Sequence, residues 1–173
     1  FPYTTLFRSS AGAQVVQRYA LLGHDQPALE TAGVQVRYVI ANPSSYTYFD
    51  ERRPVAFSHA GCSQFNRWKY GLADLPAYAE GQTAALLQEK YLKRDIVYLL
   101  GQQDVDPNHP ALDKSCEAKA QGPYRLARGR YYFAYLKRLQ PQGLQQQLIE
   151  VPGVGHNGDG MFTSVQGRQA LFP

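Results

Sequence analysis

The sequence predicts an α/β domain in which a mostly parallel β-sheet lies between helices, giving three layers. Three apolar runs, residues 34–41, 95–100 and 147–151, have the composition of buried strands. Segments with helical periodicity separate these runs, and strands joined through helices pair in parallel. The chain has 173 residues, of which 44% are hydrophobic and 18% charged, as expected of one globular domain.

The first nine residues, FPYTTLFRS, have two interpretations. Over their whole length they resemble the translation of a sequencing-library adapter, and such a scar does not belong to the natural fold. On this interpretation residues 1–9 are adapter-derived, residues 10–173 are a partial domain, and the upstream strands of the sheet are missing. The alternative is a genuine strand over residues 3–7.

Ser10, Ala11 and Gly12 resemble the second half of a nucleophile elbow, G-x-S-x-G, in which a serine occupies a sharp turn between a strand and a helix. Arg8 stands where this motif has its first glycine. A helix is predicted over residues 11–22, because an apolar stripe recurs there at helical spacing. The amino end of this helix would direct the backbone N–H of Ala11 toward the reaction centre as an oxyanion donor.

The stretch that follows the strand over residues 34–41 has no regular spacing of apolar residues that would indicate a helix or a strand. Residues 44–75 mix aromatic side chains with prolines, glycines and polar residues, as binding loops and lids do. We expect a cap-like or substrate-binding insertion over residues 44–93, and the alternative is aromatic packing at the sheet edge. The residues expected to bind substrate are Tyr46, Tyr48 and Trp68.

A loop with two carboxylates follows the next strand. A helix predicted over residues 82–92 leads into residues 95–100, whose nearly continuous apolar character indicates a strand buried on both faces. Gly101 permits a sharp turn, and Asp104 follows at the carboxyl end of the strand, where α/β active sites lie. Asp106 is the alternative acid; otherwise it braces the loop.

A histidine follows the last strand in the same way. A short helix is predicted within residues 111–120 and a longer one over residues 125–139, before the strand at 147–151. His156 lies in the glycine-rich loop after that strand, where glycines let the imidazole project into a site without crowding. A final short helix over residues 160–171 is predicted to pack back onto the sheet.

Together, Ser10, Asp104 and His156 provide the groups of a catalytic triad. Serine is a poor nucleophile unless a base takes its proton, which His156 would do. Asp104 would hold the imidazole in the required tautomer and stabilise its protonated form. The order Ser, Asp, His along the chain is that of α/β-hydrolases. The alternative for His156 is a hydrogen-bonded loop histidine without a catalytic role.

The two cysteines, Cys62 and Cys116, occupy polar, loop-like stretches rather than apolar runs. A disulfide between them would close a loop of 54 residues and contribute roughly 3–4 kcal/mol to stability. Such a bridge favours an extracytoplasmic location, because the cytosol keeps thiols reduced. The alternative is two unrelated thiols, in which case the location is unspecified. No His cluster accompanies the pair, so a zinc site is not indicated.

The formal net charge of +4 is spread along the chain instead of being concentrated in one stretch. This favours a solvated surface over a nucleic-acid-binding face. No apolar run approaches the roughly 18–20 residues of a membrane span. Neither a nucleic-acid partner nor a membrane span is therefore expected, and the oligomeric state is not predicted.

Three stretches carry a family resemblance: SAGAQVVQRYA from Ser10, YLLGQQDVDPNHPALDKSC from Tyr98, and VPGVGHNGDGMF from Val151. They resemble the C-terminal half of bacterial serine α/β-hydrolases, near esterases of the polyhydroxyalkanoate-depolymerase-like group. The resemblance implies a truncated α/β-hydrolase fold with an incomplete sheet. It also implies hydrolysis of a small-molecule or polymeric carboxylic ester through an acyl-enzyme, without metal or organic cofactor. Arg8 and the missing upstream half imply that this chain is an inactive fragment.

Two other functions stay open at this point. One is a non-catalytic binding protein that retains the hydrolase scaffold. The other is a hydrolase-fold enzyme acting on amide or carbon–carbon bonds, since these activities use the same triad.

Overall fold

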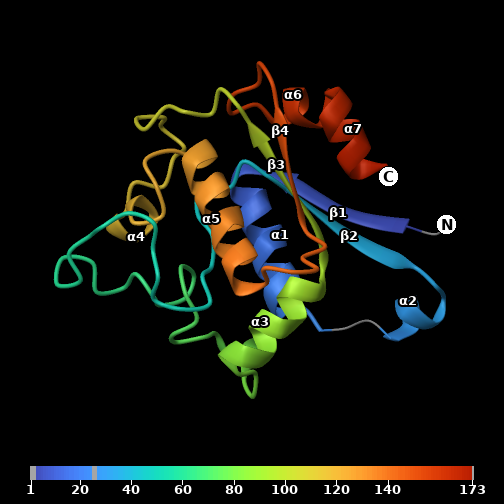
Figure 1. Ribbon diagram of the computed structural model, residues 1–173, viewed down its shortest axis with the longest axis horizontal. Coiled ribbons are helices and arrows are strands. Elements are labelled where there is room, and N and C mark those ends of the chain that lie inside the picture. The colour runs from blue at the N-terminus through green and yellow to red at the C-terminus, as the bar shows by residue number, and fades with distance from the viewer. Residues whose placement is uncertain (1–2, 25–26, 173) are drawn as a thin grey trace.

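The computed structural model describes residues 3–24 and 27–172, and its centre is a parallel sheet with the strand order β1-β2-β3-β4 (Figure 1). The strands are β1 (Tyr3–Ser9), β2 (Gln35–Ala41), β3 (Asp95–Gly101) and β4 (Gln147–Val151). Each pairs in parallel with the next one along the chain, so all carboxyl ends lie at one edge of the sheet. The predicted parallel α/β architecture is confirmed.

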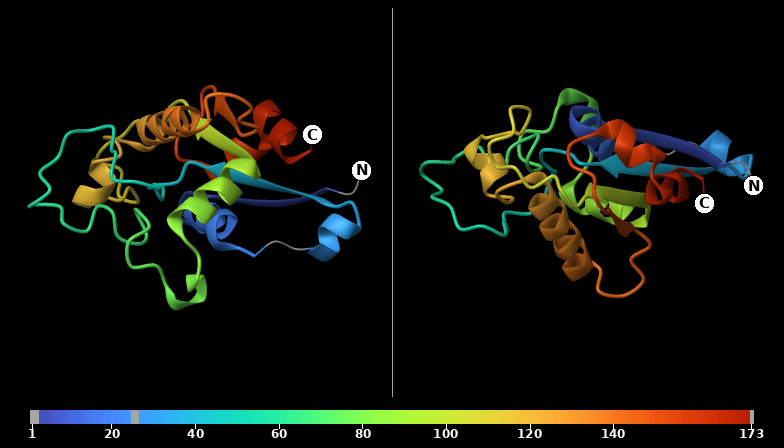
Figure 2. Two further views of the ribbon diagram at one scale, coloured as in Figure 1. Left: turned by 60° about the horizontal axis from the view of Figure 1, so that its bottom comes forward. Right: turned by 90° about the horizontal axis from the view of Figure 1, so that it is seen from above.

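Helices cover both faces of this sheet and make three layers (Figure 2). One face carries α1 (Ser10–Leu22), α3 (Ala84–Lys93) and α5 (Arg125–Leu139), and the other carries α6 (Gly158–Thr163) and α7 (Val165–Leu171). The connections contain α2 (Pro27–Thr31), α4 (Cys116–Lys119) and a 3₁₀ turn, η1 (Ala77–Ala79).

The alternation of side chains along the strands explains why the predicted runs are apolar throughout. In β3, Ile96 and Tyr98 belong to the core under α1, α3 and α5, whereas Val97 and Leu99 belong to the core under α6 and α7. Successive residues of a strand point to opposite faces, so a strand covered on both sides is apolar at every position.

Residues 3–9 form a regular edge strand, β1, which pairs with β2 from Tyr3 opposite Gln35 to Ser9 opposite Ala41. Their structure therefore follows the alternative prediction of an N-terminal strand. Phe7 is 39% exposed at this edge, where no further strand pairs among the described residues. Residues 1 and 2 of the adapter-like stretch lie outside the described residues, and its origin stays a prediction.

Element boundaries differ from the prediction mainly near the carboxyl end. The helix predicted over residues 160–171 is two helices, because Ser164 interrupts it and caps the second one by accepting a hydrogen bond from Gly167 N at 2.9 Å. The short helix predicted within residues 111–120 is α4. The sequence analysis did not predict α2.

Much of the tyrosine content packs into the core between the sheet and the helices. Tyr46 stacks on Tyr132 with ring centroids 4.4 Å apart, and Tyr48 meets the same ring edge-on at 5.1 Å. The buried hydroxyl of Tyr132 donates to Thr47 O at 3.0 Å, which ties α5 to the long segment after β2. Residues 44–49 are thereby held as part of the domain interior.

Cys62 and Cys116 form a disulfide, with their Cα atoms 5.7 Å apart. The pairing predicted from their polar sequence contexts is confirmed. The bridge joins the long segment after β2 to the amino end of α4, and therefore to the loop that follows β3.

Replacing both cysteines with Ser is expected to lower the free energy of unfolding by roughly 3–4 kcal/mol, because the 54-residue loop is then open in the unfolded chain. Urea unfolding monitored by circular dichroism measures the difference. The wild-type chain with a reductant should match the double variant. An unfolding midpoint that does not move in either case would contradict the prediction.

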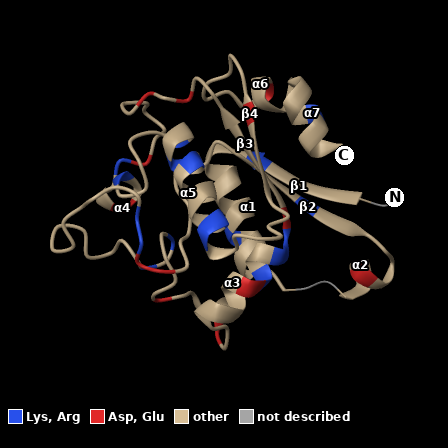
Figure 3. Ribbon diagram, in the orientation of Figure 1, with Lys and Arg blue, Asp and Glu red and all other residues tan. Residues whose placement is uncertain are grey.

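Charged side chains of both signs are distributed over the molecule (Figure 3). Lys and Arg occur on α3, α5 and α7 and around α4, with Asp and Glu between them. Among the helices of the described residues, none has the length and apolar character required to cross a membrane.

Candidate active site

Four polar residues follow the four strands at the carboxyl edge of the sheet. Ser10 follows β1, Asn42 follows β2, Asp104 comes three residues after β3, and His156 lies in the loop after β4. Because parallel strands end at the same edge, the topology gathers these residues although they span most of the chain.

Ser10 occupies an abrupt turn from strand to helix. Its φ of 53° lies in the left-handed region, which is uncommon for a residue other than glycine. Gly12 allows the turn to close, because a Cβ at this position would lie 2.9 Å from the Cβ of Arg8. Arg8 therefore fits where the motif has its first glycine, but only with a glycine at position 12.

The hydroxyl of Ser10 lies in a continuous hydrogen-bonded chain. Its Oγ is 2.9 Å from His156 Nε2, and His156 Nδ1 is 2.9 Å from Asp104 Oδ2. With Nδ1 protonated, His156 donates to Asp104 and its Nε2 accepts from Ser10. This is the arrangement in which a serine can lose its proton to a base.

Asp104, and not Asp106, reaches His156. Asp104 is buried, and the turn that holds it is closed by a hydrogen bond from its N–H to Gly101 O at 3.1 Å. Asp106 is exposed and accepts from Asn108 N at 2.8 Å, which stabilises the loop locally. The geometry matches the loop-bracing role that the sequence allowed for Asp106.

Glycines bring the histidine loop close to its neighbours. A Cβ on Gly101 would lie 2.5 Å from Val154 O, so the end of β3 can approach the loop only as glycine. A Cβ on Gly158 would lie 2.6 Å from Ser9 Oγ, beside the turn that presents Ser10. The loop containing His156 thus fits between the ends of β1 and β3.

Asn42 connects the ends of the two strands that carry the acid and the histidine. Its side chain accepts from Gly101 N at 2.8 Å and donates to Gly155 O at 3.2 Å. It is 1% exposed, and its φ of 46° aims the amide away from the strand. Asn42 was not among the site residues predicted from the sequence, where the signal was an Asn, a residue type that tolerates the left-handed conformation, directly after a strand.

Burial lowers the pKa of His156 below its ordinary value, and the opposing effect of the hydrogen bond to Asp104 is smaller. The nearby positive charge of Arg125 also lowers this pKa. A lowered pKa keeps the imidazole neutral around pH 7, as a base must be. His109 packs edge-on against His156 with ring centroids 4.8 Å apart.

The amino end of α1 offers backbone donors beside the serine. Ala11 is the second residue of the helix, and N–H groups of a first helical turn have no partner within the helix. The preceding residue, Ser9, makes no side-chain cap, and no acidic residue lies in the first turn. The amino end of α1 therefore lies directly after Ser10, with the helix dipole positive at this end.

The three aromatic residues expected to bind substrate lie elsewhere. Tyr46 and Tyr48 are 0% and 1% exposed in the aromatic core, so they have no free surface for a ligand. Trp68 is partly exposed and lines a hollow along α1, between this helix and residues 68–78.

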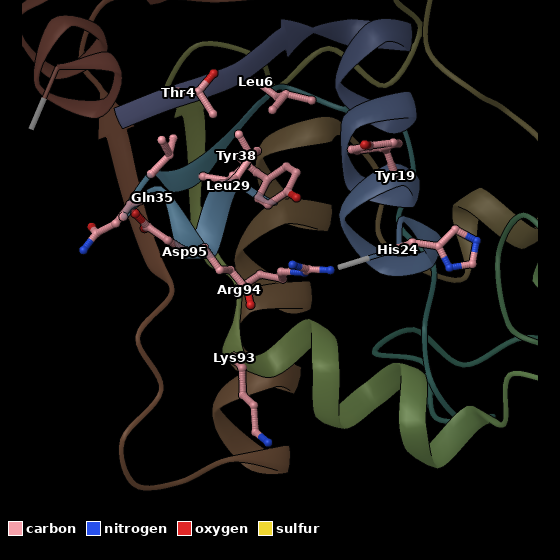
Figure 4. A pocket seen from close by; sticks show the side chains of 14 residues that line it. Thr4, Leu6, Tyr19, His24, Leu29, Gln35, Tyr38, Lys93, Arg94 and Asp95 are labelled. Atoms are coloured by element: carbon pink, nitrogen blue, oxygen red, sulfur yellow. The ribbon is translucent and has the colours of Figure 1, made fainter. Parts of the chain in front are cut away.

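A cavity of about 660 Å³ lies at the opposite edge of the sheet, where the strands begin (Figure 4). Thr4, Gln35 and Asp95 line it from β1, β2 and β3, whereas Ser10, Asp104 and His156 do not. Among the described residues, the one group with metal-type ligands is Cys62, Cys116 and Glu117, in which the disulfide occupies both sulfurs.

Arg125 is a further site residue that the sequence analysis missed. Its guanidinium lies 3.3 Å from Asp104 Oδ1, and both side chains are buried. Arg125 and Arg128 fall on the same helical stripe as Tyr132 and Tyr135, which is the buried face of α5. Arginines at apolar-stripe positions were a signal of buried charge in the sequence.

Among the solved structures that this chain resembles are two proteins named for the degradation of polymers. Poly(aspartic acid) hydrolase-1 from Sphingomonas sp. KT-1 is 26% identical over the whole of this chain and 56% of that protein, with a TM-score of 0.72. LpqC, a poly(3-hydroxybutyrate) depolymerase from Bordetella parapertussis, is 30% identical over 92% of this chain and 45% of that protein, with a TM-score of 0.64.

The chain therefore spans about half the length of these two proteins. Its four parallel strands and flanking helices correspond to a truncated α/β-hydrolase-like fold, as the resemblance implied. No protein-family model matches the chain. No curated protein matches it either.

Proposed function

We propose that this chain contains the triad of a serine hydrolase that cleaves carboxylic esters through an acyl-enzyme. The observation that carries the proposal is the hydrogen-bonded chain from Ser10 Oγ through His156 to buried Asp104, at the carboxyl edge of a parallel sheet. The likeness to two polymer-degrading proteins independently supports a hydrolase.

In the proposed mechanism, Ser10 Oγ attacks the ester carbonyl carbon while His156 Nε2 takes the hydroxyl proton. Asp104 stabilises the resulting imidazolium through Nδ1–H, and the Ala11 N–H donates to the oxyanion. His156 then gives the proton to the departing alkoxide, which leaves Ser10 acylated. A water molecule, deprotonated by His156, cleaves the acyl-enzyme and restores the serine.

The substrate class that we propose is a small-molecule or polymeric ester. One of the similar proteins is named for poly(3-hydroxybutyrate), which is a polyester, and the other for poly(aspartic acid). We further propose that this chain is an inactive fragment of a longer hydrolase, since a second oxyanion donor would come from a loop upstream of β1, and losing one such donor costs about 10²–10³ in rate. The disulfide supports an extracytoplasmic location.

Reaction with a fluorophosphonate probe tests the nucleophile in the 173-residue chain without requiring full turnover. Such probes modify a serine that a neighbouring base activates. We expect one probe per chain, attached to Ser10 in the peptide map, and no modification in Ser10→Ala or after unfolding in urea.

The matched control is Ser9→Ala, which removes the adjacent hydroxyl and should react like the wild type. Modification that persists in Ser10→Ala would contradict the proposal. A wild-type chain that is folded but does not react would contradict the proposed activation of Ser10 in this chain. The same probe on the longer protein then separates the two remaining explanations: reaction there indicates an inactive fragment, and no reaction indicates a non-catalytic binding protein on the same scaffold.

A further inference from the structure

A buried ion pair extends the hydrogen-bonded chain beyond the triad acid. Asp104 uses Oδ2 for His156 and Oδ1 for Arg125 Nη1, at 3.3 Å. The side chains of Arg125 and Asp104 are 0% and 1% exposed, so solvent does not screen their interaction. Each oxygen of the carboxylate thus has a separate partner on a different element.

The guanidinium of Arg125 is held on its remaining sides. Its Nε donates to Ser44 Oγ at 3.1 Å, and its Nη2 donates to Ala111 O. The planar fork of donors therefore has a fixed orientation with respect to Asp104. The next residue, Leu126, donates its N–H to Asp104 O at 3.2 Å, so the first turn of α5 is attached to the acid's backbone as well.

Burying an arginine carries a large desolvation cost, and Arg125 is buried beside Asp104, the acid of the proposed triad. We propose that Arg125 is a positioning residue: it orients Asp104 toward His156 and offsets the negative charge of the carboxylate, so that the imidazole stays an unprotonated acceptor for Ser10. The effect of Arg125 on the protonation of His156 requires only the observed geometry, whereas a role of Arg125 in catalysis rests on the proposed function.

The charged and titratable groups that face His156 come from two elements. Asp104 lies on the loop after β3 together with His109, and Arg125 lies on α5. Asp104 raises the pKa of His156, whereas Arg125 and His109 lower it. Removing the charge of Arg125 therefore raises the apparent pKa at which the Asp104–His156 pair binds its first proton. This holds whether the proton resides on Asp104 or on His156.

Two substitutions separate the charge of Arg125 from its hydrogen bonds. Arg125→Gln keeps an amide donor but is neutral, whereas Arg125→Lys keeps the charge but loses the fork. The control is Arg130→Met, because Arg130 lies on the same helix but is exposed and pairs with Glu150. His156→Gln identifies the signal of His156 among the four histidines.

The measurement is an NMR titration of the histidine ring protons in the 173-residue chain. In Arg125→Gln the apparent pKa of His156 is expected to rise by about one unit, the effect of removing a charge several ångströms away in a partly hydrated site. In Arg125→Lys and Arg130→Met it should stay close to the wild-type value. Circular dichroism establishes that each variant is folded.

An unchanged His156 pKa in folded Arg125→Gln would overturn the inference, and so would an equal rise in Arg130→Met. If Arg125→Gln does not fold, the Arg125→Lys variant decides. A wild-type pKa of His156 in this variant would support the inference, and a raised pKa would overturn it, because geometry and not charge would then control the imidazole. The titration does not depend on turnover. A shifted pKa in a chain whose Ser10 does not react with the probe would support this inference and contradict the proposed function.

Discussion

Replacing Ser10 with Ala, or His156 with Gln, is expected to reduce kcat for ester hydrolysis by about 10⁶-fold, the scale of loss when a serine triad lacks its nucleophile or its base. The two residues act as one unit, because Ser10 Oγ is activated only through its 2.9 Å contact with His156 Nε2. The double variant should therefore be no slower than either single variant.

The assay uses short aryl esters and the longer protein that we propose contains residues 10–173, with this chain measured in parallel. His24→Gln is the control, because His24 is exposed and does not contact the triad. Activity that survives in Ser10→Ala would show that the triad is wrong. Equal rates for the chain and the longer protein would disprove the proposal that the chain is an inactive fragment.

Replacing Asp104 with Asn is expected to reduce kcat by about 10⁴-fold, because an amide favours the wrong tautomer of the histidine. The same change leaves Arg125 as a buried cation without its carboxylate, which should lower the free energy of unfolding by about 3–5 kcal/mol. It also removes the group that raises the pKa of His156, so that pKa should fall further.

Steady-state kinetics and urea unfolding of Asp104→Asn measure these two effects. Asp106→Asn is the matched control, since its carboxylate accepts only a local hydrogen bond from Asn108 and should matter little. A larger loss of activity in Asp106→Asn than in Asp104→Asn would assign the acid to Asp106. Loss of activity without loss of stability in Asp104→Asn would mean that the pair with Arg125 contributes little to the fold.

The sequence by itself determined the parallel α/β architecture and the order of the candidate site residues at the carboxyl edge of the sheet. Apolar runs separated by helical segments require parallel strands, and parallel strands bring their carboxyl ends together. Asp104 and His156 could be selected because each comes shortly after such a run, and Ser10 because Ser10-Ala11-Gly12 matches half of an elbow motif. The disulfide could be predicted because both cysteines lie in polar stretches. The catalytic role of the three residues stays a proposal.

Only the tertiary structure decided which side chains are buried and what they contact. Tyr46 and Tyr48 could face either a ligand or the core, and the position of α5 over the sheet places them against Tyr132. The helical pattern could place Arg125 on the buried face of α5, but only the packing of α5 against the loop after β3 shows that its partner is Asp104. Contacts of this kind join residues far apart in the chain, so their energies depend on packing that no local pattern records. Strand propensity and hydrophobic period are local properties of the chain, so the strands and helices could be predicted from the sequence.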